Sequence, residues 1–392
     1  MLLHWIWFAE LNLPLREKHR LLERYADPEE LYHCADVPVQ DKDLTAAEEI
    51  LRRCNKKGIK LLPIEDVAYP SRLRNTPDAP VLLYYKGILP DWESVPFIGV
   101  VGTRKASAYG LQVAHQLGSQ IAYSGGFVVS GGASGIDTAA MQGALDAGCP
   151  VVGVLGCGLD VVYPRNNRRL FEAVMKNGCL ISEYPPEAQG LAWHFPERNR
   201  IISGVSNGVL IVEAPKKSGA LITARQALEQ GRDVFVVPGN INTVTCEGSN
   251  ILLQEGAMPV FSGWDVLREY EFLYPGKLQK HRKAPLYTEE TVSAKVAQTT
   301  QMPGENAADD EGRRKKPIDN KENSTYSVLE NRNPALGDEE RAVLAQLTRE
   351  PKETAELIAK LNMPSGKVLS VLTMLTVKGM VTKHPGGRFS LK

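Results

Sequence analysis

Six short apolar runs alternate with helical patterns between residues 97 and 239 and predict the architecture of the middle of the chain. The runs are continuously apolar, and each ends near Gly or Pro. Continuous hydrophobicity is typical of parallel strands that helices cover on both faces. The pattern therefore predicts a doubly wound, Rossmann-like α/β domain that extends to about Leu273. The runs are FIGVV (97–101), FVVSGG (127–132), VVGVLG (151–156), CLISEY (179–184), VLIVEA (209–214) and VFVVPG (234–239).

The flanking segments have other patterns and predict three further regions. Residues 1–60 show helical spacing of apolar positions and are expected to form a small helical domain. Residues 61–95 lead into the sheet, so the α/β domain spans 61–273. Residues 274–335 are polar and predict a disordered linker, whose RRKK cluster we interpret as a solvated charge run. Residues 336–392 combine three helical patterns with a Gly-Gly hairpin, which predicts a winged helix that contacts either DNA or protein.

Composition narrows the function classes. Lysine plus arginine and aspartate plus glutamate both number 46 in 392 residues, so a histone-like basic protein is excluded while a local basic groove is not. The six cysteines form no C-x-x-C pair, which predicts neither a zinc ribbon nor a disulfide framework and fits a reducing cytoplasm. The apolar start lacks a basic region and a cleavage site, and no run reaches the roughly 18 apolar residues of a membrane span. We therefore expect a cytoplasmic protein without a membrane span or a metal.

The loops after the predicted strands carry the candidate chemistry. Parallel strands end at one edge of the sheet, so these loops are expected to converge there. Glycine-rich turns and helix starts offer backbone N–H groups to anions, and arginine donates two parallel hydrogen bonds to a phosphate. The candidate phosphate-binding residues are Gly102, Thr103, Arg104, Ser107, Gly132, Ala133, Ser134, Gly135, Arg165, Asn166, Asn199, Arg200, Ser218, Gly219 and Thr223.

Plainer interpretations exist for several of these residues. Arg104 is also compatible with a solvent-facing turn, and the segment 193–200 with a buried aromatic corner. That segment interleaves aromatic and guanidinium groups, a mixture suited to base stacking and phosphate contact. The loops contain no nucleophile–base pair, no metal-ligand spacing and no pair of unpartnered carboxylates. They predict recognition of phosphate-bearing material, with no catalytic residue and no cofactor.

The ordered motifs GTRKAS, SGGASGID, GCGLDVVYPRNN, FPERNRIISG, VEAPKKSGALITA and VPGNI resemble the DNA processing protein A (DprA/Smf) family over about residues 60–265. The resemblance implies a non-enzymatic protein that binds and protects incoming single-stranded DNA, dimerises and loads the RecA recombinase in natural transformation. It implies phosphate contacts at Arg104, Arg165 and Gly132–Gly135, and a sterile-alpha-motif-like N-terminal domain. Thr103 replaces the family's usual Ser, and Arg165 stands where relatives often have Lys.

A second function and an assembly surface remain as hypotheses. Nucleotide phosphoribohydrolases share a similar sheet, but their signature glutamate has no counterpart after Thr223 until Glu229. Ile251, Leu252 and Leu253 are consecutive, so on a helix they span roughly 200° and cannot all face one core. Relatives in the family dimerise near this end of the sheet, so these three residues are the candidate homodimer interface, unless the N-terminal domain covers them.

Overall fold

The computed structural model describes two units, Met1–Gly304 and Glu305–Lys392, which we treat separately. In the first unit it describes residues 2–25, 27–34 and 42–280. In the second it describes residues 338–348, 350, 352–361, 363, 368, 371–372, 374–376, 380–384 and 388–391. Most of the predicted linker, including its RRKK cluster, lies outside the described residues.

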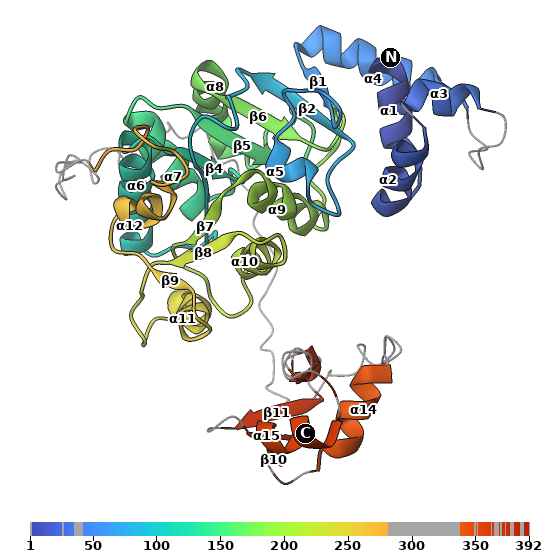
Figure 1. The fold of residues 1–392 in the computed structure, drawn as a ribbon. Helices are drawn as coiled ribbons and strands as arrows, with labels where there is room; N and C mark the ends of the chain where they lie inside the picture. The colour runs from blue at the N-terminus through green and yellow to red at the C-terminus, as the bar shows by residue number, and fades with distance from the viewer. Residues whose placement is uncertain are drawn as a thin grey trace, which may run out of the picture. The chain divides into compact units, whose positions relative to one another are not determined.

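The core of the first unit is a nine-stranded sheet of order β1-β2-β6-β5-β4-β3-β7-β8-β9 (Figure 1). The six predicted strands are confirmed as β3 to β8. The seven strands at the β9 side of this order, from β6 through β3 to β9, all run parallel. Strands β1 and β2 extend the sheet beyond β6 by antiparallel pairing, which the sequence did not reveal. The strands are β1 (Lys60–Pro63), β2 (Leu82–Gly87), β3 (Phe97–Val101), β4 (Phe127–Ser130), β5 (Val151–Leu155), β6 (Cys179–Ser182), β7 (Gly208–Ile211), β8 (Asp233–Val236) and β9 (Met258–Pro259).

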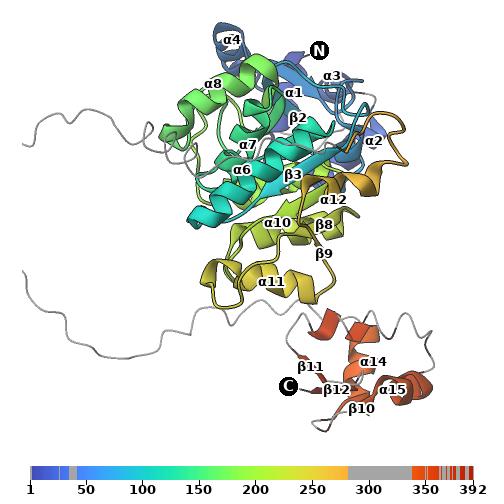
Figure 2. The same ribbon diagram turned by 90° about the vertical axis from the view of Figure 1, so that its left-hand side faces the viewer.

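Helices cover both faces of this sheet, as the Rossmann-like prediction requires. One face carries α6 (Ala108–Tyr123), α7 (Ile136–Asp146), α8 (Arg168–Asn177) and α12 (Gly263–Leu267) (Figures 1 and 2). The other face carries α5 (Ser71–Arg74), α9 (His194–Val205) and α10 (Gly219–Glu229). The chain moves outward from β3 to β6 and then returns to β7, so the order reverses between β3 and β7. Ligands of doubly wound sheets bind beyond the carboxyl ends of strands at such a reversal.

The packed part of the first unit continues past the predicted boundary at residue 273. Tyr274 and Leu278 are buried in its core, and the Tyr274 hydroxyl lies 3.2 Å from the Asn207 amide nitrogen. Residues 274–280 therefore belong to the α/β domain. The polar composition of the segment hid these two anchors. Short 3-10 turns complete the domain: η1 (Arg165–Asn167), η2 (Val244–Cys246) and η3 (Arg268–Tyr270), with α11 (Glu247–Gln254) between β8 and β9.

The N-terminal region is helical, as predicted. Its helices are α1 (Leu2–Glu10), α2 (Leu15–Arg24), α3 (Pro28–His33) and α4 (Thr45–Lys57). Trp5, Ile6, Phe8 and Leu31 form their shared core. Helix α1 packs on β2, so this region lies at the β1–β2 edge of the sheet, opposite β9.

The second unit has its own small core and a three-stranded sheet of order β10-β12-β11. It contains α14 (Asp338–Gln346), β10 (Lys352–Glu353), α15 (Thr354–Leu361), β11 (Val381–His384) and β12 (Arg388–Leu391). The predicted hairpin is confirmed by the antiparallel β11–β12 pair. Much of the third predicted helix lies outside the described residues. Among the residues described, no helix is long and apolar enough to cross a membrane.

Candidate nucleic-acid interface

A cleft of about 720 Å³ opens at the carboxyl edge of the sheet, where the strand order reverses. The loops after β3 and β7 form its two sides, and the Thr103 amide joins them by donating to the Glu213 carbonyl at 2.8 Å. The starts of α9 and α10 complete the lining. The sequence prediction that these loops converge is therefore correct, and the position follows from the fold alone.

Positive charge dominates the lining. Arg104 and Lys105 follow β3, Lys217 follows β7, and all three side chains are exposed. Within residues 42–280, none of the three has an acidic side chain at ion-pair distance, whereas neighbouring Lys216 pairs with Glu247 at 3.4 Å. These three cations are therefore available to an anionic ligand.

A fourth cation, Arg198 of α9, lies buried beneath them. Its guanidinium donates to the Gly131 carbonyl at 2.7 Å and also to the Val154 carbonyl. The carboxylate of Asp137, on α7, accepts from the Gly131 amide at 3.1 Å. Burial raises the pKa of Asp137, and the nearby Arg198 charge opposes that rise. Arg198 and Asp137 thus hold the glycine-rich loop against β5 as an internal scaffold.

An aromatic wall faces the same space. The Arg104 guanidinium lies 4.8 Å from the centre of the Phe195 ring. The centres of the Tyr163 and Phe195 rings lie 5.2 Å apart. Tyr163 is exposed and lines the cleft with Phe195. Trp193 is also exposed, whereas His194 is buried and stacks on Tyr184 at 3.9 Å, which makes it a packing residue. The cleft therefore offers both charge and a stacking surface.

The local turns explain how the loops are held. The Ser107 hydroxyl caps α6 by accepting from the Gly110 amide, and it donates to the buried Glu213 carboxylate at 2.5 Å. Gly135, which directly precedes α7, has φ +87°, and an added Cβ would lie 2.5 Å from the Thr103 carbonyl oxygen. Only glycine fits that turn without strain.

Several loop amides are already used inside the protein. The amides of Gly131 and Ala133 donate to Asp137, and that of Lys105 donates to the Thr103 hydroxyl. Fewer backbone N–H groups of these loops are therefore open to an anion than the sequence analysis expected. Side-chain cations supply more of the attraction for an anion than the sequence indicated.

The structure brings eight of the fifteen candidate residues to the cleft. They are Gly102, Thr103, Arg104, Ala133, Asn199, Ser218, Gly219 and Thr223. The other seven do not line it: Ser107, Gly132, Ser134, Gly135, Arg165, Asn166 and Arg200. Gly132 and Gly135 shape the adjoining loop, and Ser107 is bound to Glu213.

Arg200 is the clearest correction among these seven. It is buried, and its guanidinium binds both Glu183 carboxylate oxygens at 2.8 Å. Asp78 lies 3.4 Å away on the other side. These acids come from distant parts of the sequence, so no local pattern showed that the charge is already neutralised. Arg165 and Asn166 are exposed on η1, two and three residues beyond Tyr163, and stay outside the cleft lining.

Sequence reasoning missed five residues at or beneath the cleft: Lys105, Tyr163, Phe195, Arg198 and Lys217. Lys105 and Lys217 lie in the loops after β3 and β7, and that position is the signal that could have identified them. The alternation of aromatic and basic residues in 193–200 had indicated stacking, but not which ring faces the cleft.

The residues that line the cleft include few acid–base groups. The one carboxylate among them, Asp137, is buried and bound to amides, and they include no histidine or cysteine. Glu229, the first glutamate after Thr223, ends α10 and lies about ten residues, or roughly 15 Å, from the start of that helix. The phosphoribohydrolase alternative therefore has no glutamate at the cleft.

Fold and cleft together define a doubly wound α/β protein with a cationic, aromatic-lined cleft at its strand-order reversal. The model of the family described as DNA recombination-mediator protein A matches residues 60–271, and that of the DprA winged helix domain matches residues 329–387. The chain therefore belongs to the DNA processing protein A (DprA/Smf) family, as the motifs indicated. Both the Rossmann-like fold and the C-terminal winged helix are confirmed.

Individual relatives agree with this assignment. DNA processing protein DprA of Bacillus subtilis (strain 168) is 42% identical over 220 residues, which cover 56% of this chain and 74% of that protein. Protein Smf of Synechocystis is 32% identical over 344 residues, covering 87% of this chain and 82% of that protein. The X-ray structure of DNA processing protein A from Streptococcus pneumoniae is 37% identical with a TM-score of 0.60, covering 68% of this chain and 95% of that one. This chain is thus similar to DNA-processing proteins along most of its length.

Proposed function

We propose that the cleft binds single-stranded DNA without strong sequence preference and that the protein is a non-enzymatic recombination mediator. The observation that carries the proposal is the combination of Arg104, Lys105 and Lys217 with the Phe195–Tyr163 wall. Cations attract the phosphates, and aromatic rings stack on bases of any identity. Family membership gives independent support for a DNA ligand.

The shape of the ligand follows from the same geometry. Stacking on this wall, whose exposed ring is that of Tyr163, requires a base whose face is open, and bases inside a duplex stack on one another. A single strand can turn its bases toward the wall while its phosphates meet the cations at the rim. Few side chains in the cleft are suited to reading base edges, so sequence preference is expected to be weak.

Binding to equal-length single-stranded and duplex oligonucleotides tests this proposal. We expect tighter binding to the single strand and a fall in affinity with added salt, because bound counterions are released. Equal affinity for both forms, or a complex insensitive to salt, would contradict it. The same preparation is expected not to hydrolyse nucleoside monophosphates.

The mediator part of the proposal concerns the RecA recombinase and the protection of incoming DNA during natural transformation. Both come from the family resemblance. The experiment is RecA filament assembly on a strand already coated by a single-strand-binding protein. We expect the chain to shorten the delay before assembly, and Arg104→Ala to lose that effect. An unchanged delay at saturating protein would refute the mediator role while leaving DNA binding intact.

We also propose a homodimer through α11. Ile251 is 37% exposed, Leu253 is partly exposed, and Leu252 is only 7% exposed. The three consecutive residues therefore divide between core and surface, as their spacing predicted. The N-terminal helices pack at the β1–β2 edge, at the opposite end of the strand order from β8 and β9, which favours a second subunit over that domain as the cover.

A further inference from the structure

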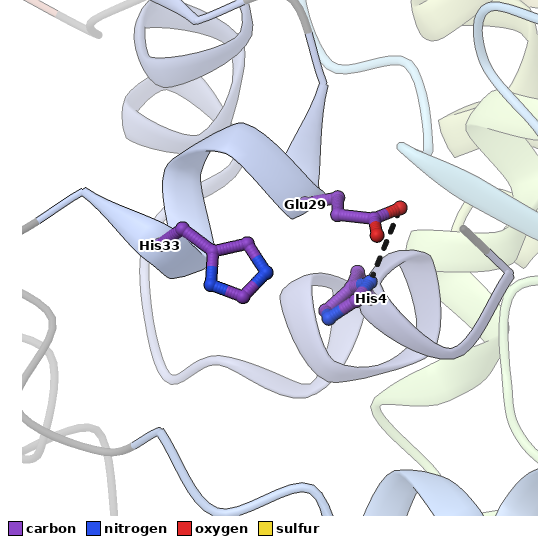
Figure 3. Close-up of side chains that lie close together, drawn as sticks. All are labelled: His4, Glu29 and His33. Atoms are coloured by element: carbon purple, nitrogen blue, oxygen red, sulfur yellow. Dashed lines mark ion pairs between the residues drawn. The ribbon is translucent and has the colours of Figure 1, made fainter.

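Three metal-ligating side chains meet in the N-terminal helical region, far along the chain from the cleft loops. His4 comes from α1, and Glu29 and His33 come from α3. One ligand atom from each lies within 4.8 Å of the others. Figure 3 shows the His33 ring and the Glu29 carboxylate on the same side of α3, both turned toward His4.

The local sequence fixes this arrangement. Glu29 and His33 are four residues apart, so they share one face of their helix. The Asp27 carboxylate caps that helix by accepting from the Glu29 amide at 2.8 Å, which sets where the helix begins. His4 sits between the two on the facing helix, with its ring centre 5.0 Å from that of Tyr32.

His4 is the unusual member. Its side chain is 12% exposed, and its Nδ1 atom lies 3.6 Å from a Glu29 carboxylate oxygen. Among the described residues, this buried nitrogen has no hydrogen-bond partner. Leaving a buried polar atom unsatisfied costs stability, so such an atom calls for an explanation. A bound cation is one that also accounts for the two neighbouring ligands.

The spacing fits a tetrahedral metal. Zinc–ligand distances of about 2.1 Å place two ligands roughly 3.4 Å apart. The His4–Glu29 separation of 3.6 Å is already close to that value. His33 is exposed, and its ligand atom lies within 4.8 Å of those of His4 and Glu29.

The ligand chemistry favours the same occupant. Two imidazole nitrogens and one carboxylate oxygen, gathered within 4.8 Å of one another, match the ligand preference of zinc.

We propose that His4, Glu29 and His33 bind one divalent transition-metal ion of the zinc class. The ion joins α1 to α3 and so fastens the first helix of the chain to the rest of the helical region. Three protein ligands leave a fourth position, which water fills because Glu29 and His33 face solvent. This site is independent of the DNA cleft and of the proposed DNA function.

The test is a Zn²⁺ titration of the full-length, untagged, metal-free chain against a chromophoric chelator. We expect one ion per chain. Loss of a residue that only orients a metal ligand already costs about 10–100-fold in metal affinity. His33 and Glu29 are direct ligands in this proposal, so His33→Ala and Glu29→Gln are expected to weaken Zn²⁺ binding by more than about tenfold. Glu30→Gln is the matched control, because it removes the adjacent charge of the same helix turn, and it is expected to bind like the parent.

Two further readouts keep the proposal falsifiable. Saturating Zn²⁺ is expected to raise the unfolding midpoint of the parent and of Glu30→Gln, but not that of His33→Ala. Because the His33 side chain is exposed, His33→Ala is expected to fold normally, so a missing shift would reflect lost metal binding. Co²⁺ is expected to give ligand-field bands without a thiolate charge-transfer band, which separates this site from the six cysteines. Absence of saturable Zn²⁺ binding, binding unchanged by His33→Ala and Glu29→Gln, or a thiolate band would overturn the proposal.

Discussion

Replacement of Arg104 tests the arrangement of the cleft in detail. Its guanidinium is exposed and lies against the Phe195 ring at 4.8 Å. A hydrogen bond to a charged group contributes about 1.5–3 kcal/mol. Solvent screening at this exposed position favours the lower end of that range. Because 1.4 kcal/mol corresponds to a factor of ten, Arg104→Ala is expected to raise the Kd for single-stranded DNA about tenfold.

Two comparison variants separate charge from stacking. Arg104→Lys keeps the charge but loses the planar contact with Phe195, so we expect a loss of only about two- to fivefold. Arg169→Ala removes an exposed arginine on α8, outside the cleft lining, and is expected to bind nearly like the parent.

Fluorescence anisotropy of a labelled oligonucleotide at several salt concentrations measures all three variants. For Arg104→Ala the slope of log affinity against log salt is expected to fall by about 0.7, and for Arg104→Lys to stay unchanged. Circular dichroism checks that the fold is retained. Equal loss in Arg104→Ala and Arg169→Ala, or an unchanged slope in Arg104→Ala, would refute the placement of the phosphate contact.

Three other predictions test the loops and the assembly. Gly135→Ala puts a Cβ 2.5 Å from a backbone oxygen at a residue with φ +87°, so it is expected to lower the free energy of unfolding by at least about 1 kcal/mol. Gly219→Ala is the control, because an added Cβ there meets open space, and it is expected to leave the free energy of unfolding nearly unchanged. Chemical denaturation measures both, and equal effects would contradict the strain argument. Glu213→Gln weakens the hydrogen bonds that the buried Glu213 carboxylate accepts from Ser107 at the start of α6. We expect the free energy of unfolding to fall by about 1.5–3 kcal/mol in the same assay, and unchanged stability would contradict this role of Glu213. Ile251→Glu is expected to halve the molar mass measured by light scattering, while the DNA affinity per subunit is retained. A variant that stays dimeric, or a parent protein that is monomeric at micromolar concentration, would rule out this interface. Leu252 is unsuitable for that test because it is buried.

The main sheet could be predicted from the sequence because its strands are apolar on both faces. The continuous runs at β3 to β8 therefore stood out without any knowledge of pairing. Strands β1 and β2 escaped notice because they join the sheet through β2, whose antiparallel pairing with β6 depends on a contact about 95 residues away. The end of the domain was placed too early because Tyr274 and Leu278 are isolated anchors in a polar segment.

The location of the candidate site was predictable for a similar reason. Loops after parallel strands share an edge, so Thr103, Arg104 and Ser218 could be brought together without coordinates. The state of each charge could not be predicted in this way. Whether Arg200 is paired and Lys217 is unpaired depends on acids supplied by other elements, which sequence neighbours do not reveal.

Photocrosslinking tests the central claim, that single-stranded DNA lies in this cleft against its aromatic wall, most directly. A single strand carrying 5-iodouracil is bound to the full chain, irradiated and digested, and the modified peptides are identified by mass spectrometry. We predict modification of Tyr163 or Phe195, the rings that line the cleft. Modification confined to peptides outside the cleft, such as those of residues 338–391 or the N-terminal helices, would contradict the account.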